Sequence, residues 1–110
     1  MKKIIAAACA VSLSLLSTSA FAETPSFDII IKEHKFSPST LEIPAEQKVK
    51  LVIKNQDPTP EEFESHELNR EKVIAGNSEG IVYVEPLKAG EYPFFGEFNE
   101  KTAQGKIIVK

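Results

Sequence analysis

The feature that most constrains the fold is a series of short apolar runs separated by turn-forming residues. In residues 48–54, Val49, Leu51 and Ile53 fall on one side of an extended chain, and lysines occupy most of the other side. Because the side chains of a strand alternate between two faces, this period-2 pattern predicts a strand with one buried face. Comparable runs lie at residues 27–32, 81–84 and 106–109, with weaker candidates at 40–43 and 92–95.

Turn residues lie between all of these runs. Proline, glycine and asparagine recur there, as in Asp57-Pro58-Thr59-Pro60 and in residues 86–90. Six to eight short strands at this spacing predict an all-β protein with a β-sandwich fold. Residues 23–110 suffice for a single domain that buries roughly 60–65% of its unfolded surface.

The first 22 residues are typical of a secretory signal peptide. A basic start at residues 1–3 precedes a mostly apolar stretch at 4–16, and Ala20-Phe21-Ala22 has the A-x-A form of a cleavage site. The apolar stretch is too short and too rich in serine to span a membrane. We therefore expect residues 1–22 to be removed on secretion and residues 23–110 to form the mature domain, with no membrane span.

The mature domain has no cysteine and no methionine, because Cys9 and Met1 lie in the expected leader. Disulfides, thiolate nucleophiles, zinc–thiolate sites and iron–sulfur clusters are therefore excluded. A blue-copper centre is excluded as well, since it needs a cysteine sulfur. The loss of Lys2 and Lys3 leaves 11 basic and 16 acidic residues, a formal charge of −5. This balance is not that of a nucleic-acid-binding protein.

The segment that begins at Thr59 is ambiguous. Thr59-Pro60-Glu61-Glu62 has the cap, the proline and the acidic first turn of a helix start. However, only two large apolar residues lie at positions 61–72, so a helix here would have no apolar stripe to bury. We predict an extended segment with Phe63 on one side. The opposite side then carries Glu62, Glu64 and His66.

Carboxylates and imidazole are the remaining candidates for chemistry, because no serine elbow or phosphate loop indicates a catalytic residue. Glu62, Glu64 and His66 span roughly 13 Å on an extended chain, so adjacent members could share one ion with a ligand from elsewhere. A second polar cluster at residues 96–100 supplies Glu97. Clustered like charges raise one another's pKa, and a bound cation relieves that repulsion.

A plainer interpretation stays open beside the metal site. Charge runs usually face water, and Arg70 and Lys72 would then be loose ion partners of a solvated acidic loop. Glu97 taken alone is typical of an exposed carboxylate, and His34 of a surface histidine at a strand end. The aromatic residues of the second cluster are expected to pack in the core or at its rim: Phe94, Phe95 and Phe98.

The order of these features resembles the cupredoxin fold over residues 27–110. The features that carry the resemblance are Lys35-Phe36-Ser37-Pro38, Leu41 to Ala45, a strand ending at Asn55, Leu87 to Tyr92, and Gly105 to Val109. More narrowly, the chain resembles the EfeO-type cupredoxin-like domains of bacterial periplasmic iron-uptake systems, in the small free-standing form that accompanies an iron permease. Glu62-Phe63-Glu64 lies where that family carries a Glu-aromatic-Glu motif, and residues 93–98 lie where related small members have an aromatic pair and an acidic loop.

The resemblance implies a Greek-key sandwich in which the loop after Asn55 and the loop before the last strand meet at one end. Glu62 or Glu64 would then approach Glu97, with His66 nearby. Aromatic side chains are expected to shield that site: Phe63, Phe95 and Phe98.

The chain also departs from the pattern of the fold. Where blue-copper proteins supply Cys, His and Met before the last strand, the nearest equivalents here are Gly96, Asn99 and Ala103. Related small proteins often have histidine at the position of Asn99. The donors that remain are carboxylates and one imidazole, which suit iron or manganese better than Cu(I), with Cu(II) a further candidate.

These observations predict a periplasmic metal-binding protein that takes part in iron acquisition. We expect it to hold an iron or copper ion and to pass iron toward a membrane iron permease or a periplasmic iron carrier. Two alternatives stay open. One is a ferroxidase-like enzyme that oxidises Fe(II) for a permease, and the other is a metal-free sandwich used for protein contact.

Overall fold

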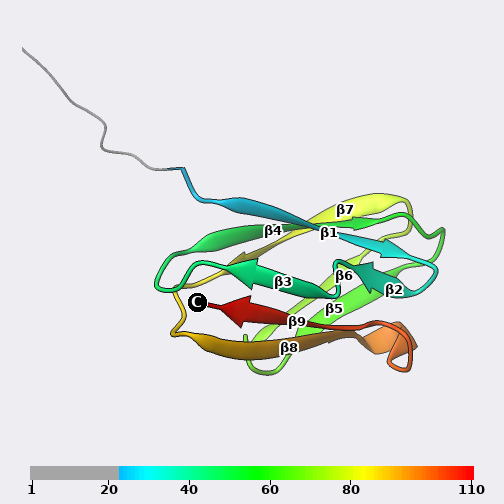
Figure 1. Ribbon diagram of the computed structural model, residues 1–110. Coiled ribbons are helices and arrows are strands. Elements are labelled where there is room, and N and C mark those ends of the chain that lie inside the picture. The colour runs from blue at the N-terminus through cyan, green and yellow to red at the C-terminus, as the bar shows by residue number, and fades with distance from the viewer. Residues whose placement is uncertain (1–22) are drawn as a thin grey trace, which may run out of the picture.

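The computed structural model describes residues 23–110, and the expected signal peptide at residues 1–22 lies outside them. The strands are β1 (Ser26–Lys32), β2 (Lys35–Ser37), β3 (Thr40–Ile43), β4 (Val49–Asn55), β5 (Glu61–Ser65), β6 (Arg70–Ile74), β7 (Ser78–Val84), β8 (Gly90–Gly96) and β9 (Gln104–Val109), and a short 3-10 helix, η1 (Glu97–Asn99), follows β8. They form one sheet with the order β2-β1-β4-β7 and another with the order β3-β9-β8-β5-β6, as Figure 1 shows. The predicted all-β sandwich is confirmed.

The chain crosses repeatedly between the two sheets. β1 and β2 belong to the first sheet, β3 to the second, β4 to the first again, and β5 and β6 to the second. Two neighbouring pairs are therefore parallel, β1 with β4 and β3 with β9, whereas the other pairs are antiparallel. These crossings place β5 beside β8, the strand that leads into η1.

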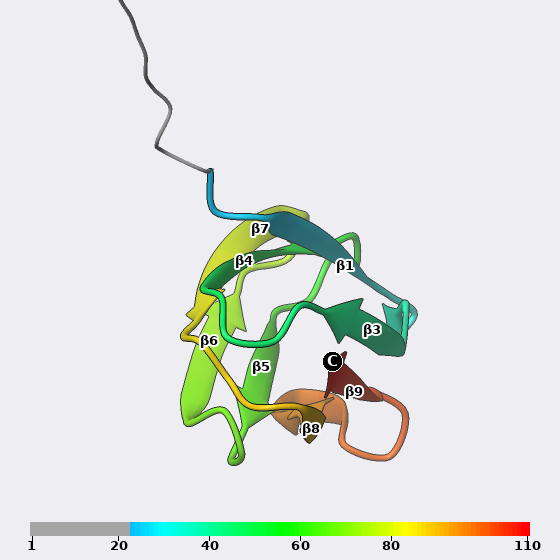
Figure 2. The ribbon, with the colours of Figure 1, turned by 60° about the vertical axis from the view of Figure 1, so that its left-hand side comes forward.

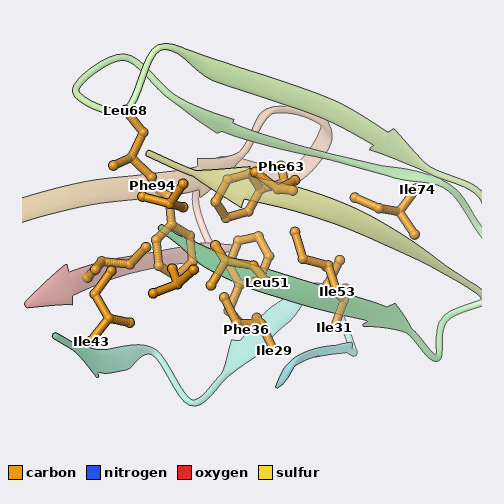
Figure 3. Close-up of a cluster of buried hydrophobic side chains, with 14 of the residues drawn as sticks. Ile29, Ile31, Phe36, Ile43, Leu51, Ile53, Phe63, Leu68, Ile74 and Phe94 are labelled. Atoms are coloured by element: carbon orange, nitrogen blue, oxygen red, sulfur yellow. The ribbon is translucent and has the colours of Figure 1, made fainter. Parts of the chain in front are cut away.

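The core follows from the alternation of the strands. Val49, Leu51 and Ile53 of β4 are fully buried, as the period-2 pattern predicts. The rings of Phe63 in β5 and Phe94 in β8 pack together, with their centroids 5.0 Å apart (Figure 3). The Phe36 ring meets the Phe94 ring edge-on, also with 5.0 Å between centroids. Each such buried side chain contributes roughly 1.5–3 kcal/mol through the apolar area that it removes from water.

All of the predicted strands are present, and the disputed segment is extended rather than helical, since β5 covers residues 61–65. Two further strands, β2 and β6, were not predicted. β2 has only three residues next to a proline, and β6 exposes or half-exposes every residue except Ile74. Neither strand carries the apolar alternation that makes a strand recognisable.

The edges of the two sheets meet where β6 lies beside β7 (Figure 2). Arg70 of β6 spans this edge. Its Nε donates a hydrogen bond of 2.9 Å to the carbonyl oxygen of Tyr83, and its Nη2 lies 3.9 Å from Oε2 of Glu85. The guanidinium therefore contacts Tyr83 and Glu85, and it forms no ion pair with an acidic residue of β5. Within residues 23–110, no helix has the length and apolar character needed to cross a membrane.

Candidate metal centre

The candidate site begins with the alternation of β5. Phe63 and Ser65 are buried in the interior, with at most 1% of their surface exposed, while Glu62 and Glu64 are only partly buried on the other face. Successive side chains of a strand point to opposite faces, so the two glutamates share one face. Glu62 and Glu64 therefore lie on the side of the strand opposite Phe63, as predicted.

Glu97 joins this pair because of the pairing between β5 and β8. Gly96, the last residue of β8, lies opposite Phe63, and the next residue, Glu97, opens η1. The carboxylate oxygens of Glu62, Glu64 and Glu97 come within 4.8 Å of one another. We call these three residues the carboxylate cluster. The two acidic segments that the sequence singled out thus meet at one place.

The carboxyl groups of the cluster repel one another when ionised, and the pKa values of Glu62 and Glu64 are both raised. A hydrogen bond with the Glu97 carboxyl, together with burial and the charges of Glu97, Glu62 and Glu71, raises the pKa of Glu64 to about 7. Burial, followed by the charge of Glu97, raises the pKa of Glu62 as well. Without a metal, Glu64 is therefore partly protonated near neutral pH.

Compensating side-chain cations are scarce around the cluster. Within residues 23–110, no lysine or arginine forms an ion pair with any of its three carboxylates. Arg70, which the solvated-loop interpretation would pair with these acids, faces β7 instead. The cluster lacks the counter-charges that would make it an ordinary surface ion-pair network.

His66 lies at the rim of the cluster. It follows the end of β5, its Nδ1 is 3.8 Å from Oε2 of Glu64, and 74% of its side chain is exposed. Its ring centroid is 5.5 Å from that of Phe95. His66 is thus near the site, as expected, but it is not among the three residues whose donor atoms converge.

An open hollow gives the cluster access to solvent. It has a volume of about 490 Å³ and is bordered by Glu64, Ser65, His66, Asn69, Arg70 and Glu71. Of the cluster residues, Glu64 borders this hollow, and Glu97 is itself exposed to solvent.

Glu61, which lies next to the cluster in β5, is a buried carboxylate that sequence reasoning missed. Only 2% of it is exposed, and its carboxylate accepts three hydrogen bonds. Oε1 accepts from the backbone N–H of Glu62 at 2.9 Å and of Phe98 at 2.8 Å, and Oε2 accepts from the Asn99 side chain at 2.7 Å. The signal was the alternation itself, which puts position 61 on the same side as Phe63.

Gly96 is required by this arrangement. A Cβ atom at Gly96 would lie 2.6 Å from Cδ of Glu61 and 2.7 Å from Cβ of Ala103, closer than non-bonded carbon atoms approach. The end of β8 therefore packs directly on the buried carboxylate.

The expected aromatic shield is only partly present. Phe63 was expected to cover the site, which is wrong: it is fully buried in the core, because alternation turns it away from Glu62 and Glu64. Phe95 lies opposite Glu64 in the β5–β8 register and is half-buried, whereas Phe98 is 51% exposed. Phe94 belongs to the core, as expected.

His34 does not contact the carboxylate cluster and lies instead beside Asp57. It lies in the turn after β1, its side chain is 48% exposed, and its Nδ1 is 3.5 Å from Oδ2 of Asp57. Asp57 also accepts hydrogen bonds from the backbone N–H groups of Glu33 and His34, at 2.7 and 2.9 Å. This histidine is a surface residue of a turn, as its sequence position predicts.

Comparison with known proteins shows that the chain belongs to a family of known fold. Residues 5–109 match the family described as cupredoxin-like domain. An uncharacterized protein of Rickettsia prowazekii (strain Madrid E), RP394, is 49% identical over 81 residues, which cover 74% of this chain and 65% of that protein. The chain therefore spans about two-thirds of the length of this curated relative.

Two solved structures with low sequence identity share the fold. The metal-binding domain of the Cu(I)-exporting P-type ATPase CopA of Streptococcus pneumoniae D39, solved with Cu(I), superposes with a TM-score of 0.69 at 15% identity, covering 77% of this chain and 84% of that one. Auracyanin A, a blue copper protein of Chloroflexus aurantiacus, superposes with a TM-score of 0.69 at 17% identity, covering 80% of this chain and 100% of that one.

The residues of this chain do not fit a blue-copper centre. Residues 23–110 contain no cysteine or methionine sulfur. Of the three positions before the last strand, Ala103 is fully buried, Gly96 packs on Glu61, and the Asn99 amide donates to Glu61. Among residues 23–110, the carboxylate cluster is the group of three or more potential ligand side chains whose donor atoms converge, and it is therefore the candidate metal site.

Proposed function

The chain belongs to the family of cupredoxin-like domains, and from that premise we propose that it is a periplasmic protein that binds iron at Glu62, Glu64 and Glu97 during iron acquisition. The observation that carries the proposal is the approach of three carboxylates to within 4.8 Å without a lysine or arginine partner among residues 23–110. A bound cation would relieve the repulsion among these carboxylates and favour their ionised form.

The donor set favours hard cations. Carboxylate oxygens suit iron and manganese, and the nearby His66 imidazole would also suit Cu(II), whereas Cu(I) prefers the sulfur ligands that residues 23–110 lack. Three protein ligands leave further coordination positions to water. A rotation of the exposed His66 side chain would supply a fourth protein ligand.

Transfer to a partner is the second part of the proposal. The cluster adjoins an open hollow, and Glu97 is exposed, so a bound ion would remain accessible for exchange. The formal charge of −5 expected for the secreted domain would favour a basic docking surface. We propose a membrane iron permease or a periplasmic iron carrier as the recipient, in line with the resemblance to EfeO-type domains and with the expected signal peptide.

Calorimetric titration of the domain formed by residues 23–110 tests the proposal, with Fe(II) under anaerobic conditions, Mn(II) and Cu(II) as separate ligands. We expect saturable 1:1 binding of at least one of these ions with a Kd below about 100 µM, a binding free energy of roughly −5.5 kcal/mol or better. Glu64→Gln and Glu97→Gln should each weaken binding by ~10-fold or more, which is about 1.4 kcal/mol.

A matched control is Glu79→Gln, which removes an exposed carboxylate from β7 in the other sheet. The affinity of this variant should equal that of the parent. Absence of saturable binding by the parent, or an equal loss in the control, would refute the metal-binding function.

A further inference from the structure

Glu61 is an unusual residue for this position, because it is a carboxylate with only 2% of its surface exposed. A buried ionised group is costly unless hydrogen bonds replace its lost water. Glu61 obtains three such bonds, and two of them come from η1: the Phe98 backbone N–H at 2.8 Å and the Asn99 side-chain amide at 2.7 Å.

We propose that Glu61 is a positioning residue for the metal centre, which holds η1 against β5 so that Glu97 reaches Glu62 and Glu64. This inference rests on the proposed metal-binding function. Glu61 itself does not contact the ion. It acts through η1, the segment that carries Glu97.

Apart from its bonds to Glu61, the connection from β8 to β9 is linked to β5 by the hydrogen bond between the Glu97 and Glu64 carboxyl groups. Its own hydrogen bonds are internal: Gly96 N–H to the Ala103 carbonyl, and Ala103 N–H to the Asn99 carbonyl, each at 2.8 Å. These bonds shape the loop but do not attach η1 to β5. Gly96 offers no side-chain cap to η1, and the distant Glu61 carboxylate takes that place.

The packing around Glu61 gives the arrangement little freedom. Gly96 approaches the Glu61 carboxylate so closely that a Cβ atom would not fit, and Ala103 packs on the same spot. If η1 moved away, the buried carboxylate would lose two of its three donors, which is strongly unfavourable for a buried charge. Glu97 is therefore held within reach of its partners.

A purely electrostatic role for Glu61 makes a different prediction. As a nearby anion, Glu61 would attract the cation through space, and any added negative charge in its neighbourhood would tighten binding. If Glu61 acts by position, the hydrogen bond to Asn99 matters, and a second carboxylate at position 99 would repel Glu61, displace η1 and weaken binding.

Three variants separate the two roles. Glu61→Gln places an amide N–H₂ against the amide of Asn99, and Asn99→Asp places two carboxylates against each other. The double variant Glu61→Gln/Asn99→Asp reverses the hydrogen bond, with the new amide donating to the new carboxylate, and it leaves the net charge unchanged.

Calorimetric titration with Mn(II) near pH 7.5 provides the measurement, with thermal unfolding to verify that each variant is folded. Both single variants should bind Mn(II) ~10–100-fold more weakly than the parent, a loss typical of residues that orient metal ligands. The double variant should return to within about threefold of the parent, because its two changes compensate each other. Tighter binding by Asn99→Asp, unchanged binding by Glu61→Gln, or a folded double variant without recovery would overturn the inference.

Hydrogen exchange of the Phe98 amide distinguishes a failure of this inference from a failure of the proposed function. Without metal, this amide should be protected in the parent and in the double variant and should exchange faster in both single variants. Absence of Fe(II), Mn(II) and Cu(II) binding by the parent would overturn the proposed function, and the Phe98 exchange rates would then show by themselves whether Glu61 holds η1. Equal Phe98 exchange in all four proteins would refute the positioning role.

Discussion

At the scale of single residues, neighbouring glutamates of β5 have the same chemistry and different roles. Glu61 is buried among N–H donors that compensate its charge, whereas Glu64 shares its surroundings with the carboxyl group of Glu97. The difference follows from one step along the strand, because adjacent side chains lie on opposite faces. Environment decides which carboxylate is structural and which could bind a cation.

The raised pKa of Glu64 predicts how stability depends on pH. The pKa is about 7 in the folded protein and 4.5 in its ordinary state, so between these values the folded protein holds more protons than the unfolded chain. The stabilising contribution is therefore complete below about pH 4.5 and is lost as the pH rises through about 7. Denaturant unfolding of the metal-free domain should show its free energy of unfolding declining across this range.

Denaturant unfolding of Glu64→Gln over the same pH range is the control. This variant has no carboxyl group to titrate at position 64, so its stability should vary less between pH 4.5 and 7. Glu62, whose pKa is also raised, should account for part of the slope that remains. A slope as steep as that of the parent would show that Glu64 holds no extra proton in the fold.

At the scale of the element, the two faces of β5 differ: one packs in the core, and the other carries the candidate metal ligands. The inner face carries Phe63, which packs against Phe94 at 5.0 Å and Phe36 at 6.2 Å between ring centroids. The outer face carries Glu62 and Glu64. Changes to the two faces should therefore produce distinct effects.

Phe63→Ala should destabilise the domain by about 3–5 kcal/mol, since it removes a fully buried ring and leaves a cavity between two others. That is a large part of the ~5–15 kcal/mol that stabilises a typical domain. Glu62→Gln, one position away, should leave the free energy of unfolding at or above that of the parent, because it removes a repulsive charge. Chemical denaturation of both variants checks this, and a small effect of Phe63→Ala would contradict the two-faced description.

Elements with apolar alternation were predictable from the sequence, whereas the polar edge strand β6 was not. β4 buries three apolar residues on one face, so its pattern was visible. β6 is an edge strand whose Val73 is 55% exposed and whose other exposed residues are charged, so only its pairing with β5 makes it a strand. Pairing between strands depends on the whole fold and leaves little trace in a local pattern.

The candidate site was predictable to a similar degree. Alternation placed Glu62 and Glu64 on one face, and the resemblance to a known fold brought Glu97 beside them. Glu61 was missed because a carboxylate is expected in water, although the same alternation put it on the inner side. Its donors in η1 come from a part of the chain that no local pattern connects to β5.

At the scale of the whole molecule, the cluster depends on the folded state. Glu62 and Glu64 come from one strand and Glu97 from the connection between β8 and β9, so the three carboxylates meet only when the second sheet is assembled. An unfolded chain separates them and binds a single ion weakly. Cation binding should therefore stabilise the folded domain by mass action.

Thermal unfolding with added Mn(II) tests this linkage. At a free ion concentration of 100 times the Kd, binding should add about 2.7 kcal/mol to the free energy of unfolding. For a domain of this size that corresponds to a rise of roughly 10–20 °C in Tm. A chelator should reverse the shift, and Glu97→Gln should reduce it, because that variant removes the carboxylate that η1 contributes to the cluster and leaves the core unchanged. A Tm that is unchanged by Mn(II), or an equal rise in Glu97→Gln, would mean that the ion does not bridge the two parts of the second sheet.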